Sequence, residues 1–153
     1  MTVPLAGDTF HIPYLIKRVQ HAVRAAVDDA LRPLGLSGSQ FAVLRWLSQT
    51  PDVSGAELAR QLSVTAQSMN ELIGVLVAHG YIERKPHPTH GRIVRMRLTP
   101  SGRKLLTKTT AMVEAVKDKM LSGLSADEQR RFARYLERCA AALEIAEAQE
   151  HSA

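Results

Sequence analysis

Hydrophobic residues recur at steps of three and four positions over most of this chain, which is typical of amphipathic helices. The first such stretch begins near Pro13 and ends at Arg32-Pro33, because a proline disfavours helical geometry in the residue before it. The same spacing predicts three shorter helices between Ser37 and His79, and two longer helices after Thr99. The protein is therefore predicted to be mainly helical.

Three of the predicted helices begin with a Ser-x-x-Glu or Ser-x-x-Gln pattern, a capping box in which each side chain bonds the other residue's backbone N–H. Thr65 is the expected N-cap of another helix, and Gly80 is expected just beyond the end of that helix. A short helix that ends near Leu62, followed at once by the helix after Thr65, predicts a helix-turn-helix. The capping boxes are Ser37 to Gln40, Ser54 to Glu57 and Ser125 to Glu128.

The pattern changes to alternation in two segments, Tyr81–Lys85 and Arg92–Leu98, which predicts a pair of short strands. In the second segment one face carries Val94, Met96 and Leu98, and the other face carries Ile93, Arg95 and Arg97. Pro86–Gly91 between them is rich in turn-forming residues, so the two strands are expected to form a β-hairpin. A helix-turn-helix followed by a hairpin is a winged helix-turn-helix, a fold that holds duplex DNA.

These elements predict a mainly α fold with a small β-hairpin wing, in which a winged helix-turn-helix is flanked by N- and C-terminal dimerisation helices. Residues 1–36 would hold a loose arm and the first helix, residues 37–102 the winged helix-turn-helix, and residues 103–153 the C-terminal helices, in one intertwined domain. The flanking helices have wide apolar stripes that three helices without a sheet bury poorly. A homodimer is the commonest way to cover them, and the alternative is a monomer with these helices folded back.

Charge is concentrated in the predicted hairpin and in the start of the next helix. The whole chain has a formal charge of +5, and the segment from Glu83 to Lys104 alone carries +6. Such a segment suits DNA phosphates, whereas three Phe, three Tyr and one Trp are few for a single-strand binder that stacks bases. The alternatives are a solvated hairpin, or arginines paired with acids such as Glu83. The seven basic residues are Arg84, Lys85, Arg92, Arg95, Arg97, Arg103 and Lys104.

The helix after Thr65 has one apolar side and one polar side. Its apolar residues lie at positions i, i+3, i+4 and i+7, so at about 100° per residue the polar residues fall on the opposite side. This polar side would face DNA in a helix-turn-helix, although a solvated surface is the alternative. The inner residues are Met69, Leu72, Ile73 and Leu76, and the outer residues are Gln67, Asn70, Glu71 and Gly74, with Ser68 at the edge.

The order and spacing of these elements resemble the MarR family of bacterial transcriptional regulators over nearly the full chain. The segments that carry the resemblance are Leu34–Leu44, Glu57–Leu62, Leu76–Arg84 and His90–Gly102, each weak alone and fairly specific together. The resemblance implies a homodimer that binds a pseudo-palindromic promoter site, usually as a repressor. It also implies a small-ligand pocket between the dimerisation helices and the winged lobe, and release of DNA when the ligand alters the spacing of the lobes.

Two departures from the family pattern change the expected contacts. The family wing usually carries Asp-x-Arg, whereas this chain has His90-Gly-Arg92, so Arg92 keeps the role of a groove-inserting arginine without that aspartate. Glu71 stands where the recognition helix often has an arginine. Gln and Asn pair with adenine and Glu accepts from cytosine, so base reading stays feasible. We expect base reading by Gln67, Ser68, Asn70 and Glu71, and backbone and wing contacts by the seven basic residues with Thr65 and His90.

The ligand pocket that the resemblance implies is sought on the first helix, the second helix and the long helix after the wing. An arginine beside aromatic side chains suits a small aromatic carboxylate or phenolic compound. Ordinary packing between helices is the alternative role for each candidate. The candidates are Tyr14, Arg18, His21, Trp46 and Met112.

Other kinds of chemistry have less support. Cys139, the single cysteine, lies on an apolar stripe, so a buried inert thiol is expected, with redox sensing as the alternative. His11 with His21 and His87 with His90 lack zinc-ligand spacing, so we expect neither a metal nor a cofactor. Enzyme signatures are missing, and no signal peptide or membrane-length apolar span is present, which favours a cytoplasmic non-enzyme. A protein–protein adaptor without a DNA role is the remaining alternative.

Overall fold

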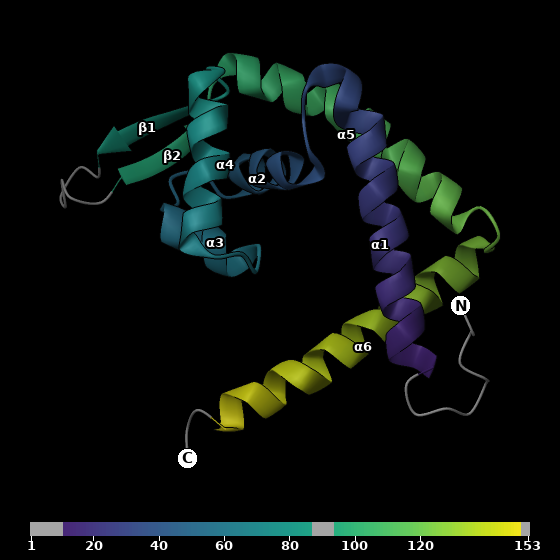
Figure 1. Cartoon of the computed structure of the whole chain (residues 1–153). Coiled ribbons are helices and arrows are strands. Elements are labelled where there is room, and N and C mark those ends of the chain that lie inside the picture. Colours follow the sequence, from purple (N-terminus) through teal and green to yellow (C-terminus); the bar gives the residue numbers. More distant parts are fainter. Residues whose placement is uncertain (1–10, 87–93, 151–153) are drawn as a thin grey trace. The chain divides into compact units, whose positions relative to one another are not determined.

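The computed structural model describes residues 11–86 and 94–150, with side chains up to residue 143 (Figure 1). It confirms the mainly helical fold with a two-stranded antiparallel hairpin. The chain divides into two compact units, Met1–Val116 and Lys117–Ala153, and the division falls inside α5. The elements are α1 (His11–Leu31), the 3-10 helix η1 (Arg32–Leu34), α2 (Gly38–Gln49), α3 (Gly55–Gln61), α4 (Ala66–Ala78), β1 (Ile82–Pro86), β2 (Val94–Leu98), α5 (Pro100–Leu121) and α6 (Ala126–Glu150).

All three predicted capping boxes form, with both reciprocal hydrogen bonds in each. At the start of α3, the Ser54 N–H donates to Oε2 of Glu57 at 2.6 Å, and the Glu57 N–H donates to Oγ of Ser54 at 3.3 Å. The serine boxes before α2 and α6 have the same arrangement. Because both partners of a box lie within four residues, the sequence alone locates these helix starts well.

The two ends of α4 also form as predicted. The Ser68 N–H donates to Oγ1 of Thr65 at 3.1 Å, which makes Thr65 the N-cap. Gly80 has a φ of 71°, the left-handed region that glycine adopts without steric cost. The Tyr81 N–H then donates to the Leu76 carbonyl at 2.9 Å, which closes the helix end.

The hairpin pairs Ile82 with Leu98 at its base and Pro86 with Val94 at its described end. β1 starts one residue later than predicted and extends one residue further. Sequence reasoning also missed that Val53, in the connection between α2 and α3, forms a β-bridge with Met96 on the other edge of β2. The hairpin is therefore attached to the helices along its second strand as well as at its base.

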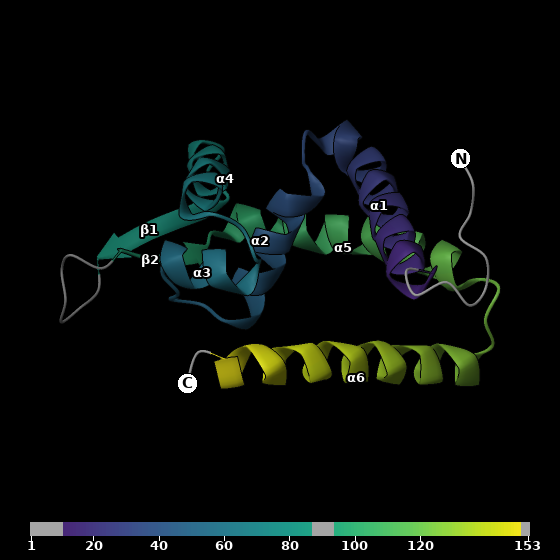
Figure 2. The ribbon, with the colours of Figure 1, turned by 60° about the horizontal axis from the view of Figure 1, so that its bottom comes forward.

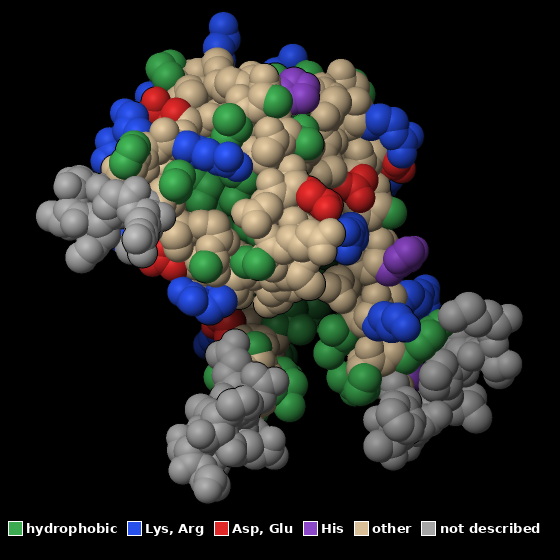
Figure 3. Space-filling view, turned by 60° about the vertical axis from the view of Figure 1, so that its left-hand side comes forward, with side chains coloured by type: hydrophobic (Ala, Val, Ile, Leu, Met, Phe, Trp, Pro, Cys, Tyr) green, Lys and Arg blue, Asp and Glu red, His purple; other side chains and the backbone are tan. Residues whose placement is uncertain are grey.

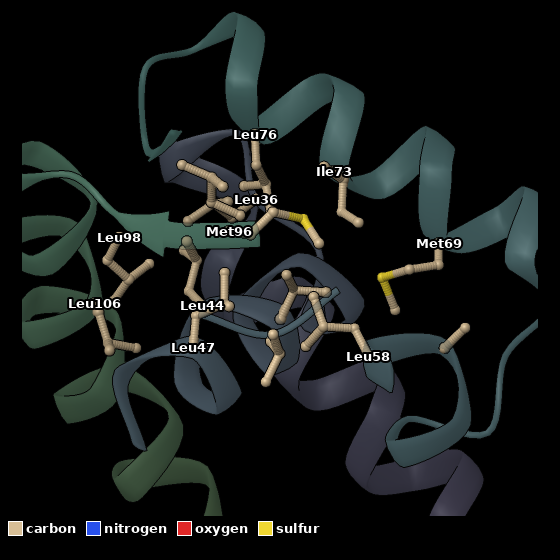
Figure 4. Packing of buried hydrophobic residues seen from close by; sticks show 14 of the residues in the cluster. Leu36, Leu44, Leu47, Leu58, Met69, Ile73, Leu76, Met96, Leu98 and Leu106 are labelled. Carbon is tan, nitrogen blue, oxygen red and sulfur yellow. The ribbon is translucent and has the colours of Figure 1, made fainter. Parts of the chain in front are cut away.

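The first unit has one hydrophobic core, made by α2, α3, α4, the hairpin and the start of α5 (Figure 4). The side chains of Leu44, Met69 and Met96 point into it from three different elements (Figure 4). Phe41 and Leu72 are half-buried and pack against this core, as their predicted stripes require. Val43, which the predicted stripe of α2 omitted, is fully buried, so the core covers a wider arc of α2 than spacing alone suggested.

Within the first unit, the hairpin and α1 lie on opposite sides of α2 (Figures 1 and 2). The start of α5 is attached tightly to the turn between α4 and β1. Oγ1 of Thr99 donates to the Gly80 carbonyl at 2.6 Å, and the Thr99 N–H donates to the Tyr81 carbonyl at 3.1 Å. A Cβ on Gly102 would lie 2.1 Å from the Tyr81 carbonyl oxygen, so only glycine permits this approach.

Two apolar stripes remain on the surface of the single chain, one on α1 and one on α6. Exposed fractions are 62% for Ile12 on α1 and 57% for Tyr135 on α6. The prediction of a buried Cys139 is wrong for the single chain, because the side of α6 that carries it is exposed. None of the described helices is long and apolar enough to cross a membrane. The exposed stripe residues include Ile12, Ile16 and Val19 on α1 and Phe132, Tyr135, Leu136 and Leu143 on α6.

Candidate nucleic-acid interface

The exposed side of α4 is the centre of the candidate interface. Met69, Ile73 and Leu76 are buried against the core, which fixes the rotation of the helix. The polar side predicted to read bases is consequently exposed from the first turn onward. Gln67, Ser68, Asn70 and Glu71 are all exposed, and their contacts with bases stay a prediction.

The four exposed polar residues are not equivalent. Ser68 belongs to the cap of α4, because its N–H donates to Oγ1 of Thr65 and its Oγ accepts from the Thr65 hydroxyl at 2.9 Å. Gln67 lies one turn before Glu71, and its Nε2 is 3.5 Å from a Glu71 carboxylate oxygen, the outer limit of a hydrogen bond. Asn70 lies on the side of α4 that faces the start of α3, since its Oδ1 is 3.7 Å from an ideal Cβ position on Gly55. Ser68 is thus part of the helix cap, whereas Gln67 and Glu71 share only this one long hydrogen bond.

Beyond Glu71 the exposed side of α4 becomes small and apolar, a feature that sequence reasoning missed. A Cβ on Gly74 would meet nothing within 4 Å, and Val75 is 43% exposed. An exposed valine on a recognition helix can contact the methyl group of thymine. The signal was present in the sequence, since Val75 falls outside the apolar stripe that predicts the buried side of α4.

The cations of the hairpin divide into two groups. Arg84 and Lys85 on β1 are exposed, and Nζ of Lys85 is 3.0 Å from the Glu83 carboxylate. Arg95 and Arg97 on β2 instead turn toward the connection between α2 and α3. There they bond acids that sequence reasoning did not consider, because their partners lie about forty residues away in the chain.

Arg97 forms a bidentate ion pair with the carboxylate of Asp52. These hydrogen bonds lower the pKa of Asp52 and raise the pKa of Arg97, so both groups stay ionised at neutral pH. Nη1 of Arg95 donates to the Asp52 carbonyl at 2.7 Å and to Oε2 of Glu57 at 3.3 Å. The pKa of Glu57 is also lowered, first by hydrogen bonds from Ser54 and then by the charge of Arg95.

The remaining predicted contacts belong to the start of α5 and to the sequence segment between the two strands. Nη1 of Arg103 donates to the Leu98 carbonyl at 2.8 Å, whereas Lys104 is exposed. His90 and Arg92 lie outside the described residues. In Figure 3 the cationic side chains that are coloured appear in separate groups, with acidic side chains beside several of them.

A recess of about 510 Å³ lies between the end of α2, the base of the hairpin and the start of α5. Its lining includes Arg97, Arg103 and Glu83, and the other lining residues are mostly apolar or small. None of the candidates for the ligand pocket lines this recess. It is therefore a different place from the pocket that the resemblance implies.

The candidates for the ligand pocket are enclosed to different degrees. Trp46 and Met112 are half-buried and pack against the hydrophobic core, and Tyr14 is half-buried on α1. Arg18 and His21 are exposed on α1. Within the described ranges, no three His, Cys, Asp or Glu side chains lie close enough together to hold a metal ion.

Comparison with known proteins identifies the family to which this architecture belongs. A family model described as the MarR family matches residues 34–93, from the last residue of η1 to the residue before β2. The HTH-type transcriptional repressor Rv2887 of Mycobacterium tuberculosis is 41% identical over 132 residues, which is 86% of this chain and 95% of the relative. The chain belongs to the MarR family. The predicted winged helix-turn-helix of that family is thereby confirmed, and so is the transcription-regulator class.

Solved MarR-family structures share the fold over most of the chain. The Mycobacterium tuberculosis protein Rv2887 in complex with salicylic acid has a TM-score of 0.73 and 40% identity, covering 88% of this chain and 99% of that chain. The same protein in complex with DNA has a TM-score of 0.71 over 84% of this chain and 96% of that chain, at 40% identity. A mutant MarR from E. coli complexed with operator DNA has a TM-score of 0.78 at 25% identity, covering 87% and 99%.

Proposed function

We propose that this protein is a homodimeric transcriptional repressor that binds duplex DNA with α4 and the hairpin and is released by a small ligand. The observation that carries the proposal is the exposed polar start of α4, capped at Thr65 and held by the core beside a basic hairpin. The family relatives named as repressors support the same function. A protein of this kind acts by binding rather than by catalysis, and it acts in the cytoplasm, where the bacterial chromosome lies.

In the proposed complex, α4 supplies base recognition and other segments supply most of the affinity. The sequence of α4 contains no Lys or Arg, so this helix offers hydrogen bonds and a methyl contact but no positive charge. Gln67 suits adenine, Glu71 suits the amino group of cytosine, and Val75 suits thymine. Phosphate contacts then fall to Arg84 and Lys104, which are exposed. Arg92, which stands between the two strands in the sequence, keeps the predicted groove-inserting role.

The proposed dimer uses the apolar stripes of α1 and α6. Ile16 on α1 is 47% exposed and Leu143 on α6 is 70% exposed in the single chain, and a second copy is the simplest cover for such stripes. Two copies related by a two-fold axis present two α4 helices to two half-sites, which matches a pseudo-palindromic operator. Cys139 lies on α6 four residues from Tyr135 and four from Leu143, so we expect its exposed thiol to lie near this dimer surface.

For the ligand, we propose a small aromatic carboxylate. The Rv2887 protein has been crystallised with salicylic acid and with p-aminosalicylic acid, which supports this chemical class. In this chain, Arg18 is the cation on α1 that suits a carboxylate, while Trp46 and Met112 offer partly enclosed apolar surface. Binding beside α1, one of the two helices that carry the dimer stripes, would change the spacing of the two α4 helices and release DNA.

The proposal is tested by titrating the protein into a fluorescent DNA fragment from the intergenic region upstream of its own gene, beside a shuffled fragment of equal length. We expect tighter binding to the natural fragment, a steep loss of affinity as salt rises, and release by sodium salicylate but not by cyclohexane carboxylate. Equal affinity for both fragments at low salt would overturn the DNA-binding role. Retained DNA binding without any response to salicylate would overturn only the proposed ligand class and leave the DNA-binding role intact.

A further inference from the structure

Asp52 has a backbone conformation that residues other than glycine rarely adopt, with a φ of 65°. It lies in the connection between α2 and α3, one residue before Val53, which forms the β-bridge with Met96. The Asp52 N–H donates to the Met96 carbonyl at 3.1 Å, and the Met96 N–H donates to the Val53 carbonyl at 3.0 Å. The connection therefore runs along the edge of β2 that β1 leaves open.

Side chains of β2 reinforce this attachment. Arg97 donates from Nε and Nη2 to the two carboxylate oxygens of Asp52. Arg95 donates to the Asp52 carbonyl and to Glu57, and Glu57 also accepts the N–H of Ser54 at the start of α3. One run of hydrogen bonds thus joins β2, the connection and the first turn of α3. We call Asp52, Glu57, Arg95 and Arg97 the wing clamp.

We propose that the wing clamp, with the Asp52 carboxylate at its centre, positions the hairpin for DNA binding, and that Arg97 acts in this clamp instead of contacting phosphate. The proposal rests on the proposed DNA-binding function and says which wing cations serve it. A single exposed ion pair contributes little to stability, but this one is bidentate and acts together with two backbone hydrogen bonds on the same edge. Its effect is therefore expected on the orientation of the hairpin more than on folding.

The proposal predicts the direction in which DNA affinity changes when the charge of Asp52 is removed. If Arg97 contacted phosphate directly, Asp52 would compete with DNA for the guanidinium, and removing the Asp52 charge would strengthen binding. If Asp52 positions the hairpin, removing its charge loosens the hairpin and weakens binding. The two roles also differ in salt dependence, since each lost phosphate contact reduces the slope of log affinity against log salt by about 0.9.

The test compares Asp52→Asn, Arg97→Gln and the double variant with the wild type on the same upstream fragment. Asparagine tolerates a positive φ better than most residues, so Asp52→Asn removes the charge and keeps the backbone conformation. Glu83→Gln is the matched control, because it also removes one negative charge from this part of the wing and leaves the clamp intact. We expect Asp52→Asn to lower affinity about threefold to tenfold, with the double variant no weaker than the weaker single variant. Glu83→Gln should bind as well as the wild type or slightly better.

The salt slope gives the second readout. Arg97→Gln should lower affinity while leaving the slope within experimental error of the wild type. Unchanged or stronger binding by Asp52→Asn overturns the proposal, and so does a slope reduced by about 0.9 in Arg97→Gln, because Arg97 would then be a phosphate contact.

A readout without DNA separates failure of this proposal from failure of the proposed function. Amide hydrogen exchange reports the bond from the Met96 N–H to the Val53 carbonyl. We expect Asp52→Asn to raise the exchange rate of the Met96 amide several-fold and to leave the amide of Leu76 in α4 unchanged. Wild-type exchange at Met96 in the variant would overturn the clamp even if the wild-type protein failed to bind the upstream fragment.

Discussion

The exposed side of α4 and the outward side of β2 look alike in the sequence, since both carry polar residues between core residues, but the structure uses them differently. On α4, the exposed side chains of Gln67 and Glu71 share one long hydrogen bond of 3.5 Å. On β2, Arg95 and Arg97 are bonded to the connection between α2 and α3. We therefore expect recognition from polar residues that more distant segments of the chain do not bond. On this surface, net charge overstates the number of cations available to DNA.

The largest effect in this comparison is expected where the hairpin meets α5. Gly102→Ala would place a methyl group 2.1 Å from the Tyr81 carbonyl oxygen, a backbone atom that cannot move without displacing β1. We expect a loss of about 3 kcal/mol in the free energy of unfolding, measured by urea denaturation, and weaker DNA binding through the displaced hairpin. Gly123→Ala is the control, because an added Cβ there meets nothing within 4 Å. A Gly102→Ala protein as stable as the control would show that α5 docks less tightly than described.

The next effect is a loss of specificity on α4. Gln67→Ala removes an exposed amide that has one weak partner, so folding should be unaffected. We expect discrimination of about 1–3 kcal/mol to disappear at one base position, with smaller changes for other substitutions in the operator. Binding to a panel of singly substituted fragments measures this directly, and Gln49→Ala at the exposed end of α2 is the control. A uniform loss over all fragments would place Gln67 on the backbone rather than on a base.

A smaller effect distinguishes the two strands of the hairpin. Arg84 on β1 is exposed, whereas Arg97 on β2 is in the wing clamp. Arg84→Ala should therefore weaken binding to all fragments alike and reduce the magnitude of the salt slope by about 0.9. Affinities measured at four or more salt concentrations give the slope. A slope equal to that of the wild type would mean that Arg84 makes no phosphate contact.

The contrast between local and distant partners explains how much could be predicted from the sequence. The capping boxes, the ends of α4 and the alternation of β2 depend on residues close in the chain, and all of them form. The wing clamp could not be predicted, because Asp52 and Arg97 are 45 positions apart and nothing in either neighbourhood indicates the other. Cys139 shows a related limit, since an apolar stripe predicts that a face is covered but not whether its own chain covers it.

The smallest expected effect is on the pH dependence of folding stability, and it distinguishes the capping box of α3 from that of α6. The Glu57 carboxylate accepts bonds from Ser54 that lower its pKa below the ordinary 4.5, so the folded state binds this proton more weakly than the unfolded state does. The stabilisation is thus complete above about pH 4.5 and is lost as the pH falls through the lower, folded value. Glu57→Gln removes the titration and retains an amide acceptor like that of Gln40 in the first capping box.

We expect Glu57→Gln to be slightly less stable than the wild type at pH 7, by about 0.5 kcal/mol, and we expect this difference to shrink as the pH falls below 4.5. Urea denaturation at pH 7, 5 and 3 measures the convergence. Glu128→Gln makes the same change in the serine box before α6, where hydrogen bonds from Ser125 also lower the pKa of the carboxyl group. Because Glu57 also bonds Arg95 of the wing clamp, only Glu57→Gln should raise hydrogen exchange at the Met96 amide. Equal exchange in the two variants would mean that the clamp ends at Asp52 and does not reach α3.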